Sequence, residues 1–430
     1  MCPNATAAKS HLSPSFCAGA TRALMMAGGT ARAHAATCNG TISPRRERVC
    51  ICLLIASTVL TMLATDFYIP SLPSIAEEFR VDERTTALTM SYNLLGILLG
   101  QAIAGPLSDF LGRWRVFYLG VAGFAMSSAI CAMAASLEAL ILFRAIQGLA
   151  SLCGGAIALA LINDLFDDIK RVRVMSLYGV AGSVSPIIGP GIGGLFELLL
   201  SWRFGFVALS ICSAALIVVA LIARPEEPTH VQSASFGGMF AAAKDLRTVI
   251  FALPCFWILS GVFAFLTAGP FIVVNSLNHS TFEFAILASV VAIGVMLGSY
   301  ITGRMAHLRA PFQVCVWGVA ALAAGGLLVV TGFLLEFGGS LTLLVLGAGI
   351  FVFNAGEGML LATLPTLALS HVEQNKGSAA TIVSLSFLSG ALCGAVLAPA
   401  DGLELGLQLI GYASLAGMCI LAGWRIYFFR

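Results

Sequence analysis

Charged residues are scarce in this sequence of 430 residues. Asp, Glu, Lys and Arg make up 10% of the chain, whereas hydrophobic residues make up 59% and the mean hydropathy is +0.95. Soluble domains carry about 25% charged residues, so this composition excludes a soluble globular protein and predicts an integral protein of the lipid bilayer. The net charge of +2 does not by itself indicate a class of protein or partner. We expect no nucleic-acid partner.

The sequence also lacks the spacings that bind metals or cofactors. Its 12 cysteines are scattered, and most of them fall within apolar stretches. Cys50 and Cys52 form the closest pair, but small buried hydrophobic side chains are a commoner use of such residues than a metal site. No zinc, haem, Walker or Rossmann pattern is found. We therefore expect no metal, no cofactor and no enzymatic activity.

Long apolar stretches dominate the chain from about residue 50 onward. A membrane-spanning helix needs about 20 such residues, and the length and uniform hydrophobicity of the stretches favour helices over a barrel. We predict an all-α integral membrane protein with twelve transmembrane helices in two six-helix bundles. The predicted helices cover residues 50–70, 86–108, 116–135, 138–165, 173–196, 204–223, 249–275, 282–305, 312–334, 341–369, 376–398 and 406–427.

Basic residues are distributed unequally between the predicted loops. If the N-terminus is cytoplasmic, most Lys and Arg residues fall on the inner side, and the outer side holds only Arg80, Arg84 and Arg203. The positive-inside rule then places both termini in the cytoplasm of a multi-pass protein, which we assign to the bacterial inner (plasma) membrane. The predicted domains are a disordered tail (1–44), an N-terminal bundle (45–223), a cytoplasmic linker (224–248) and a C-terminal bundle (249–430).

The two halves share a weak internal repeat. Leu99-Gly100 and Gly120 recur 198 residues later as Leu297-Gly298 and Gly318. Both sets fall at the end of the second predicted helix of their half or shortly after it. Parallel halves around a central site are an architecture of transporters.

Arg144 lies inside the long apolar stretch 134–166. A guanidinium at this depth costs roughly 2.5–3.5 kcal/mol on insertion, so such a residue normally faces the bundle interior or a wet cavity and has a partner. Gln147 and Gly148 follow at i+3 and i+4 on the same helix face. The alternative is a structural Arg that ties helices together through carbonyls or a carboxylate. Asp164, near the inner end of this stretch, is interpreted as a structural helix end.

Asp66 is the only acid in the apolar part of the first predicted helix. Pro70 and Pro73 break that helix, so Asp66 lies about one turn, roughly 6 Å, below its outer end. Arg144 lies roughly 9 Å below the outer end of the fourth helix, which runs the opposite way. Comparable depth favours a pairing of Asp66 with Arg144, which would offset part of the desolvation cost of each charge. The alternative for Asp66 is a helix-end carboxylate in water.

A tight loop rich in glycine and charge joins the second and third predicted helices at residues 105–115. Asp109 can accept there from Arg113 or from amides at a helix start, which would latch helix ends together. The loop resembles the G-x-L-[SA]-D-[RK]-x-G-R-R motif of the major facilitator superfamily, although Phe110 and Trp114 replace basic residues. The resemblance implies a conformational latch formed by Gly105, Ser108, Asp109, Gly112 and Arg113.

Two further motifs resemble the same superfamily. The R-x-x-Q-G motif is matched at Arg144, Gln147 and Gly148, which implies a part in proton coupling for Arg144 and Gln147. The fifth predicted helix carries prolines and glycines that favour bending and close packing. It resembles the antiporter motif G-P-x-x-G-G, with Ser185 where that motif has an upstream Gly, and packing alone is the alternative. The matching residues are Gly189, Pro190, Gly193 and Gly194.

Residues 48–430 as a whole look like the bicyclomycin-resistance (Bcr/CflA) branch of twelve-span drug/proton antiporters. The resemblance adds T-D-F-Y-I-P-S-L-P at 65–73 and S-W-R-F at 201–204 to the motifs above. The tenth predicted helix departs from the branch, because Phe353 replaces a Pro and Glu357 adds an acid near the middle of the membrane.

A mid-membrane Glu is a functional candidate, either as a proton carrier or as a binding group for a cationic substrate. We therefore add Glu357 to Asp66, Arg144 and Gln147 as a candidate proton-coupling residue. The alternative is a protonated Glu bonded to a carbonyl between flexible glycines. The candidate residues of an apolar substrate cavity are Tyr68, Phe263, Phe271 and Asn354.

These features predict a proton-coupled multidrug efflux transporter that exports small amphipathic compounds by alternating access, as a monomer. One alternative is a dedicated metabolite exporter or importer on the same fold. Another is a non-transporting membrane receptor or scaffold, but intramembrane charges argue against it because they destabilise a merely structural bundle. The implied partners are a small-molecule substrate, protons and the lipid bilayer.

Overall fold

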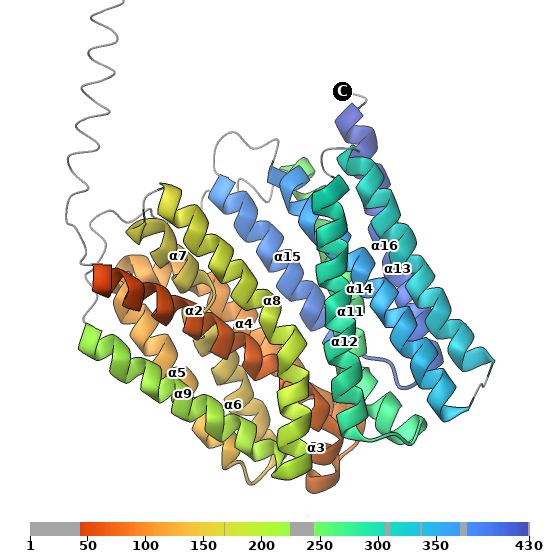
Figure 1. The fold of residues 1–430 in the computed structure, drawn as a ribbon, viewed down its shortest axis with the longest axis horizontal. Coiled ribbons are helices and arrows are strands. Elements are labelled where there is room, and N and C mark those ends of the chain that lie inside the picture. Colours follow the sequence, from red (N-terminus) through yellow and green to blue (C-terminus); the bar gives the residue numbers. More distant parts are fainter. Residues whose placement is uncertain are drawn as a thin grey trace, which may run out of the picture. The chain divides into compact units, whose positions relative to one another are not determined.

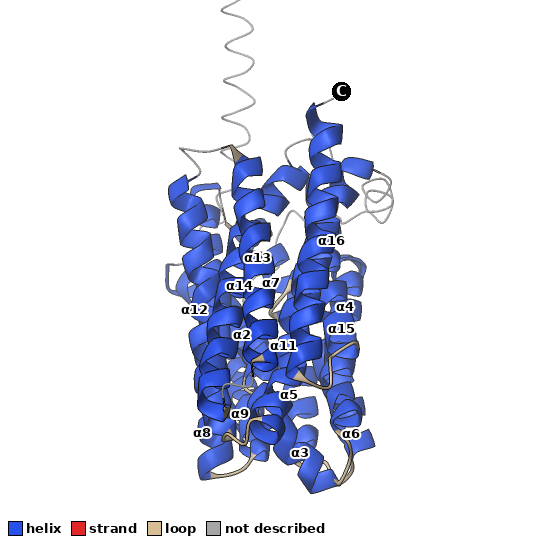
Figure 2. Cartoon of the chain, turned by 90° about the vertical axis from the view of Figure 1, so that its right-hand side faces the viewer, coloured by secondary structure: helices blue, strands red, loops and turns tan. Residues whose placement is uncertain are grey.

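The computed structural model describes residues 44–166, 168–223, 245–305, 310–335, 338–369 and 376–428. All regular elements within these ranges are helices (Figure 2). The predicted tail 1–44 lies outside the described residues except for its last residue, and so does the predicted linker 224–248 except for residues 245–248. The chain divides into Met1–Val49 and Cys50–Arg430, and the contacts described below lie within the second unit.

The helices of the N-terminal half run from red to green in Figure 1. They are α2 (Pro44–Asp66), η1 (Ile69–Ser71), α3 (Leu72–Phe79), α4 (Glu83–Leu111), α5 (Arg113–Ala132), α6 (Leu137–Ala150), η2 (Ser151–Cys153), α7 (Ala156–Leu165), α8 (Asp168–Leu199) and α9 (Trp202–Ala223). The C-terminal half contains α11 (Leu246–Phe271), η3 (Ile272–Ser276), α12 (Thr281–Met305), α13 (Pro311–Leu334), α14 (Gly339–Leu369), α15 (Lys376–Val396) and α16 (Gly402–Phe428).

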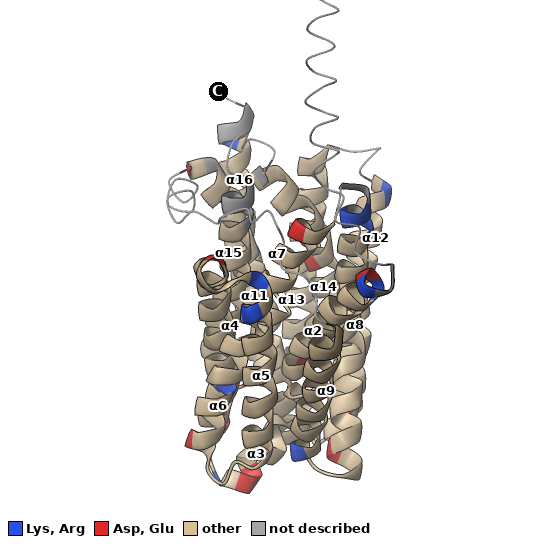
Figure 3. Cartoon of the chain, turned by 90° about the vertical axis from the view of Figure 1, so that its left-hand side faces the viewer, with Lys and Arg blue, Asp and Glu red and all other residues tan. Residues whose placement is uncertain are grey.

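The described helices have the lengths and composition of membrane spans. Eleven helical stretches among the described residues are long and apolar enough to cross a membrane, and Thr381–Val396 within α15 is a shorter apolar helix. Charged residues lie mostly near helix ends, and the middle parts of the helices contain few of them (Figure 3). This distribution suits contact with lipid. The predicted all-α membrane class with two six-helix bundles is confirmed.

The end of α2 agrees with the predicted proline break. The helix ends at Asp66, four residues before Pro70, and the chain continues as η1 and α3. Asp82 then caps α4, because its carboxylate accepts from the amide of Thr85 at 3.3 Å. The hydroxyl of Thr85 also donates to this carboxylate, and these bonds lower the pKa of Asp82 below its ordinary value. Both features fix the connection between the first two spans.

The fourth predicted span, 138–165, corresponds to the helical stretch Leu137–Leu165, but its internal break was not predicted. It breaks at η2 into α6 and α7. The carbonyl of Gly154 accepts hydrogen bonds from Thr58 (2.8 Å) and Tyr178 (3.1 Å), and the side chain of Gln101 accepts from the amide of Ala156 (2.8 Å). A broken helix is tolerated at membrane depth where neighbouring helices satisfy the freed backbone groups. Three other helices do so here.

Glycines let the helix backbones of each half approach closely. A Cβ at Gly100 of α4 would lie 2.5 Å from the carbonyl oxygen of Leu149, which follows Gly148 on α6. A Cβ at Gly298 of α12 would lie 1.9 Å from the carbonyl oxygen of Ala355 on α14. The sequence repeat therefore corresponds to one packing solution used in both halves, in which small residues replace side-chain bulk at a helix crossing.

We expect Gly148→Ala to destabilise the N-terminal half. An added Cβ would lie 2.1 Å from the carbonyl oxygen of Asn93, a backbone atom that cannot move away without shifting α4. Overpacking of this kind costs about 1–3 kcal/mol. The measurement is the thermal midpoint of the purified protein. Gly179→Ala is the matched control, because nothing lies within 4 Å of its Cβ position, and equal midpoints for the two variants would contradict the close crossing.

Candidate functional site

Arg144 is fully buried in α6 and is held by uncharged partners. Its guanidinium donates to the carbonyl oxygen of Ala64 at 3.0 Å and to the side-chain oxygen of Gln147 at 2.7 Å. Gln147 in turn donates to Ser128 of α5 at 2.8 Å. Arg144 and Gln147 thus connect α2, α5 and α6 through one chain of hydrogen bonds.

Two aromatic rings complete the surroundings of this charge. The guanidinium carbon of Arg144 lies 4.4 Å from the ring centroid of Tyr68 and 5.7 Å from that of Phe206. A desolvated cation–π contact is worth about 2 kcal/mol or more. The Tyr68 hydroxyl donates to Thr89 at 2.7 Å, which fixes the ring. Among the described residues, Nε and one terminal nitrogen of Arg144 have no hydrogen-bond partner.

The predicted pairing of Asp66 with Arg144 is wrong in this conformation. The Asp66 carboxylate accepts instead from the hydroxyl of Ser185 on α8 at 2.7 Å, and no ion pair joins it to Arg144 in the described ranges. Arg144 contacts the backbone carbonyl of Ala64 and the ring of Tyr68. Residues 64 and 66 are turned by roughly 200° on a helix, so comparable depth did not place the two charges on the same side of α2.

The proline- and glycine-rich part of α8 packs closely on the end of α2. A Cβ at Gly189 would lie 2.6 Å from the Cβ of Asp66, and a Cβ at Gly193 would lie 1.9 Å from the carbonyl oxygen of Phe67. A Cβ at Gly194 would meet the side chain of Ala285 on α12 at 2.4 Å. Pro190 is buried on this helix. These motif residues bring α8 against both α2 and α12.

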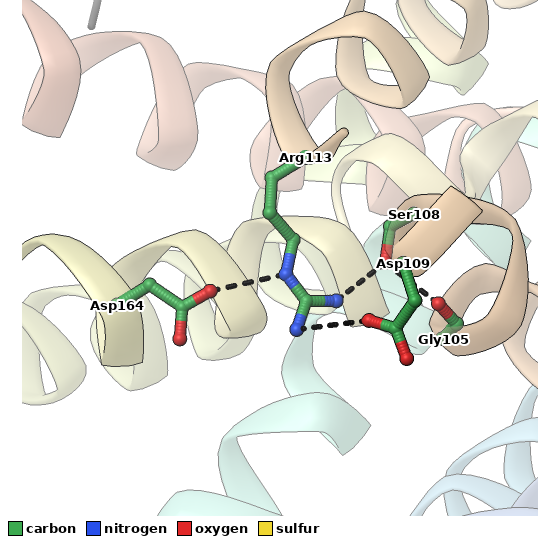
Figure 4. Close-up of polar contacts among 5 residues, drawn as sticks. All are labelled: Gly105, Ser108, Asp109, Arg113 and Asp164. Atoms are coloured by element: carbon green, nitrogen blue, oxygen red, sulfur yellow. Dashed lines mark hydrogen bonds and ion pairs between the residues drawn. The ribbon is translucent and has the colours of Figure 1, made fainter. Parts of the chain in front are cut away.

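The residues predicted to form a latch contact one another, and Arg113 lies at their centre (Figure 4). Arg113 pairs with Asp109 at 3.5 Å and donates to the hydroxyl of Ser108, which itself donates to the carbonyl of Gly105 at 2.8 Å. Gly112, just before Arg113, has a φ of 95°, a conformation that favours glycine.

Asp164 is a further partner of Arg113, which the sequence did not predict. Its carboxylate lies 3.0 Å from Nε of Arg113 (Figure 4), and both side chains are almost fully buried. We had interpreted Asp164 as a structural helix end. The available signal was its position near the inner end of the fourth span, at the same membrane face as Arg113. Together Asp164 and Arg113 join α7 to the start of α5.

We expect Asp164→Asn to impair the latch more than Asp109→Asn. The Asp164 side chain is 4% exposed and that of Asp109 is 25% exposed. Breaking a buried pair costs about 3–5 kcal/mol, whereas exposed pairs contribute about 0–1 kcal/mol. Thermal midpoints and transport rates of the two variants measure the difference. A larger loss with Asp109→Asn would show that the pair of Arg113 with Asp164, although shorter, is the less important one.

Glu357 lies near the middle of α14 and is 5% exposed. Its Oε2 has no hydrogen-bond partner in the part of the chain that the structure describes. The neighbouring glycines are packed rather than free, because a Cβ at Gly356 would lie 2.6 Å from the oxygen of Gly318 and one at Gly358 would lie 2.1 Å from that of Val295. Glu357 is therefore a buried acid on a helix segment clamped between α12 and α13.

The four predicted cavity residues have different surroundings. Tyr68 is fully buried beneath Arg144, and Phe263 is partly buried against the core of the C-terminal half. Asn354 donates to the carbonyl of Val291 at 3.4 Å. Phe271 borders a cavity of about 320 Å³ between α4, α11 and α15. Tyr68 and Phe271 belong to one buried cluster, whereas Phe263 packs against another.

The two halves contact each other at the end where α2 ends and α3 lies. This is the lower end in Figure 2. Ile69 and Met90 of the N-terminal half belong to the same buried core as Phe265 of the C-terminal half. Asn275 donates across the halves to Glu83 at 2.6 Å. We call this the α3 end, where these contacts join the two halves.

The S-W-R-F segment, residues 201–204, contacts α3 at the same end. Trp202 donates through its indole nitrogen to Glu78 at 2.6 Å. Arg203 pairs with the same carboxylate at 2.6 Å and lies over the Trp202 ring at 4.2 Å. These contacts join the end of α3 to the start of α9.

Two related helical halves in a membrane, with charged side chains enclosed between their helices, define a secondary transporter. The Major Facilitator Superfamily model matches residues 54–398, and the chain belongs to this superfamily. The protein is therefore a transporter rather than an enzyme.

Several relatives cover most of the chain at low identity. YdgK of Bacillus subtilis, an uncharacterized MFS-type transporter, is 28% identical over 84% of this chain and 90% of its own length. The chloramphenicol resistance protein CraA of Acinetobacter baumannii is 24% identical over 76% of this chain and 79% of its own length. The multidrug transporter MdfA of Escherichia coli O157:H7 is 22% identical over 76% of this chain and 80% of its own length.

Solved structures share the fold. The nucleoside transporter NupG (D323A mutant) superposes with a TM-score of 0.69 at 16% identity, covering 87% of this chain and 99% of that chain. A bacterial homologue of the human lysosomal transporter Spinster, inward-facing and unoccupied, has a TM-score of 0.67 at 18% identity, covering 89% and 98%.

Proposed function

We propose that this protein is a proton-coupled efflux transporter of small amphipathic compounds, in the Bcr/CflA branch of drug/proton antiporters. The observation that carries the proposal is the pair of ionisable residues enclosed in the N-terminal half, Asp66 and Arg144, each held by uncharged partners. The names of CraA and MdfA, a chloramphenicol resistance protein and a multidrug transporter, support the substrate class.

The proposed cycle alternates access between the two membrane faces. Contacts between the halves, such as that of Asn275 with Glu83, join them at the α3 end in this conformation. Rocking of the halves opens this end and closes the other. Asp66 carries the proton in this scheme, because protonation removes a charge that has no ionic partner among the described residues. The substrate occupies the central cavity in the other protonation state.

The proposed placement in the cell follows the charge distribution of the sequence. We assign bundles 45–223 and 249–430 to the bacterial inner membrane, with residues 224–248 and both termini in the cytoplasm. The α3 end then faces outward, and the working unit is a monomer. A panel of toxic compounds tested on an efflux-deficient bacterium checks the function: expression of the protein should raise tolerance to several amphipathic compounds. Unchanged tolerance across the panel would contradict multidrug efflux.

Arg144→Ala is expected to abolish active efflux, and Arg144→Lys is expected to rescue it poorly. Lysine keeps the charge but loses the planar group that donates to Ala64 and Gln147 and lies over Tyr68. These contacts together exceed about 1.4 kcal/mol, so the rate should fall about tenfold or more. Initial transport rates in proteoliposomes provide the measurement.

The matched control is Arg304→Lys, which changes an exposed Arg that lies 5.4 Å from the ring of Tyr300. This substitution should leave transport unchanged. If Arg144→Lys transports as well as Arg304→Lys, the buried guanidinium has no specific role beyond its charge.

Substrate-induced proton release separates the two candidate proton carriers. We expect Asp66→Asn to lose this release, because the acid at the contact of α2 with α8 is removed while the shape is kept. Glu357→Gln should retain it, since Glu357 lies on α14, away from this contact. The readout is the pH change in lightly buffered proteoliposomes on addition of ethidium. If Asp66→Asn released protons normally and Glu357→Gln did not, Glu357 rather than Asp66 would be the proton carrier.

A further inference from the structure

Ser185 makes the contact between the candidate proton carrier and α8. Its side chain is fully buried, and its hydroxyl donates to Oδ2 of Asp66 at 2.7 Å. Among the described residues, this is the hydrogen bond that the Asp66 carboxylate receives. The two residues are 119 positions apart in the chain, so the bond joins separate spans.

The same face of α8 is pressed against the end of α2. Ser185, Gly189 and Gly193 are spaced by four residues and therefore share one helix face. Cβ atoms at the two glycines would lie within 2.6 Å of the Asp66 side chain and 1.9 Å of the Phe67 carbonyl, respectively. The close approach holds the Ser185 hydroxyl within reach of the carboxylate, so movement of α8 along α2 must break the bond.

Another part of α8 contacts the opposite half. Gly191 and Gly194 approach Ser289 and Ala285 of α12, with Cβ positions 3.5 and 2.4 Å from these side chains. The two helices lie side by side in Figure 1. Gly191 is six residues from Ser185, a rise of about 9 Å along the helix. One continuous helix thus connects Asp66 with a contact between the halves.

We propose that Ser185 is a positioning residue that couples the protonation of Asp66 to the packing of α8 between the two halves. The proposal rests on the proposed proton-coupled function. A hydroxyl bond to an ionised carboxylate is roughly twice as strong as one between neutral groups. The tether between α2 and α8 is therefore strong while Asp66 is charged. Protonation weakens the tether and releases α8, which can then shift with α12 as the halves rock.

The resemblance to the antiporter motif makes Ser185 testable, because the motif has Gly at this position. If Ser185 only fills space, Gly and Ala fit easily and Thr, with an added methyl group, is the poorest replacement. If its hydroxyl acts on Asp66, the order is reversed. Thr then keeps most of the coupling, Cys keeps a weak donor and part of it, and Gly and Ala lose it.

The experiment measures protons released per ethidium transported in proteoliposomes containing the full-length protein. We expect Ser185→Ala and Ser185→Gly to lower this ratio, because losing a hydrogen bond to a charged group shifts the equilibrium that the bond stabilises by about tenfold or more. Ser185→Thr should stay near the wild type. Ser183→Ala is the matched control, since Ser183 is an exposed residue on the same helix whose hydroxyl donates, among the described residues, to the Gly179 carbonyl at 3.0 Å.

Two outcomes overturn the inference. One is a wild-type ratio in Ser185→Gly or Ser185→Ala, and the other is an equal loss with all four replacements. A second measurement adds Ser185→Ala to Asp66→Asn, where it should leave the residual ethidium exchange unchanged. A further fall there would reveal a packing defect and contradict the inference. If the wild-type protein itself releases no protons when it transports ethidium, the result contradicts the proposed proton-coupled function rather than the role of Ser185.

Discussion

A charge buried in a membrane bundle must be satisfied by the protein, and the arrangement of the N-terminal half follows from this constraint. Arg144 takes a backbone carbonyl from α2, an amide oxygen from its own helix and the faces of two aromatic rings. Those partners are themselves fixed: Gln147 by Ser128, and the Tyr68 ring by Thr89. Asn93 of α4 also donates to the Arg144 carbonyl at 3.0 Å. The Arg144 side chain thus contacts groups on α2, α6 and α9, and the bonds of its partners extend this network to α4 and α5.

Glycines supply the close contacts that this polar network needs. Gly148 follows Arg144 by four residues and lets α4 approach to where Asn93 can reach the α6 backbone. The C-terminal half uses the same device at Gly298 and Gly358, although its acid, Glu357, has no hydrogen-bond partner for Oε2 among the described residues. The two halves thus share their backbone packing and differ in their polar groups. This difference agrees with the proposal that the proton-coupling residues Asp66 and Arg144 lie in the N-terminal half.

The sequence predicted the helical class, the end of α2 before Pro70 and the latch around Arg113, because each depends on local composition or on a contiguous motif. It did not predict contacts that depend on rotation about a helix. Asp66 and Arg144 were matched by depth alone, and the angle around α2 separates them. The break at η2 was missed because Gly154 and Gly155 sit in an apolar run, and the hydroxyls that stabilise it come from distant spans. Asp164 was missed for the same reason, since its partner lies 51 residues away.

The separation of Asp66 from Arg144 limits how protonation can act in the proposed cycle. Arg144 is bound within one half by contacts to α2, α5 and α6, so it moves with that half. Asp66 instead lies where α2 meets α8, and α8 also packs on α12 of the other half. Neutralising Asp66 changes a contact beside the boundary that must rearrange when the halves rock. The guanidinium then serves as a fixed charge that keeps the N-terminal half in order. In the proposed cycle the acid is the switch, and α8 carries its state to the opposite half.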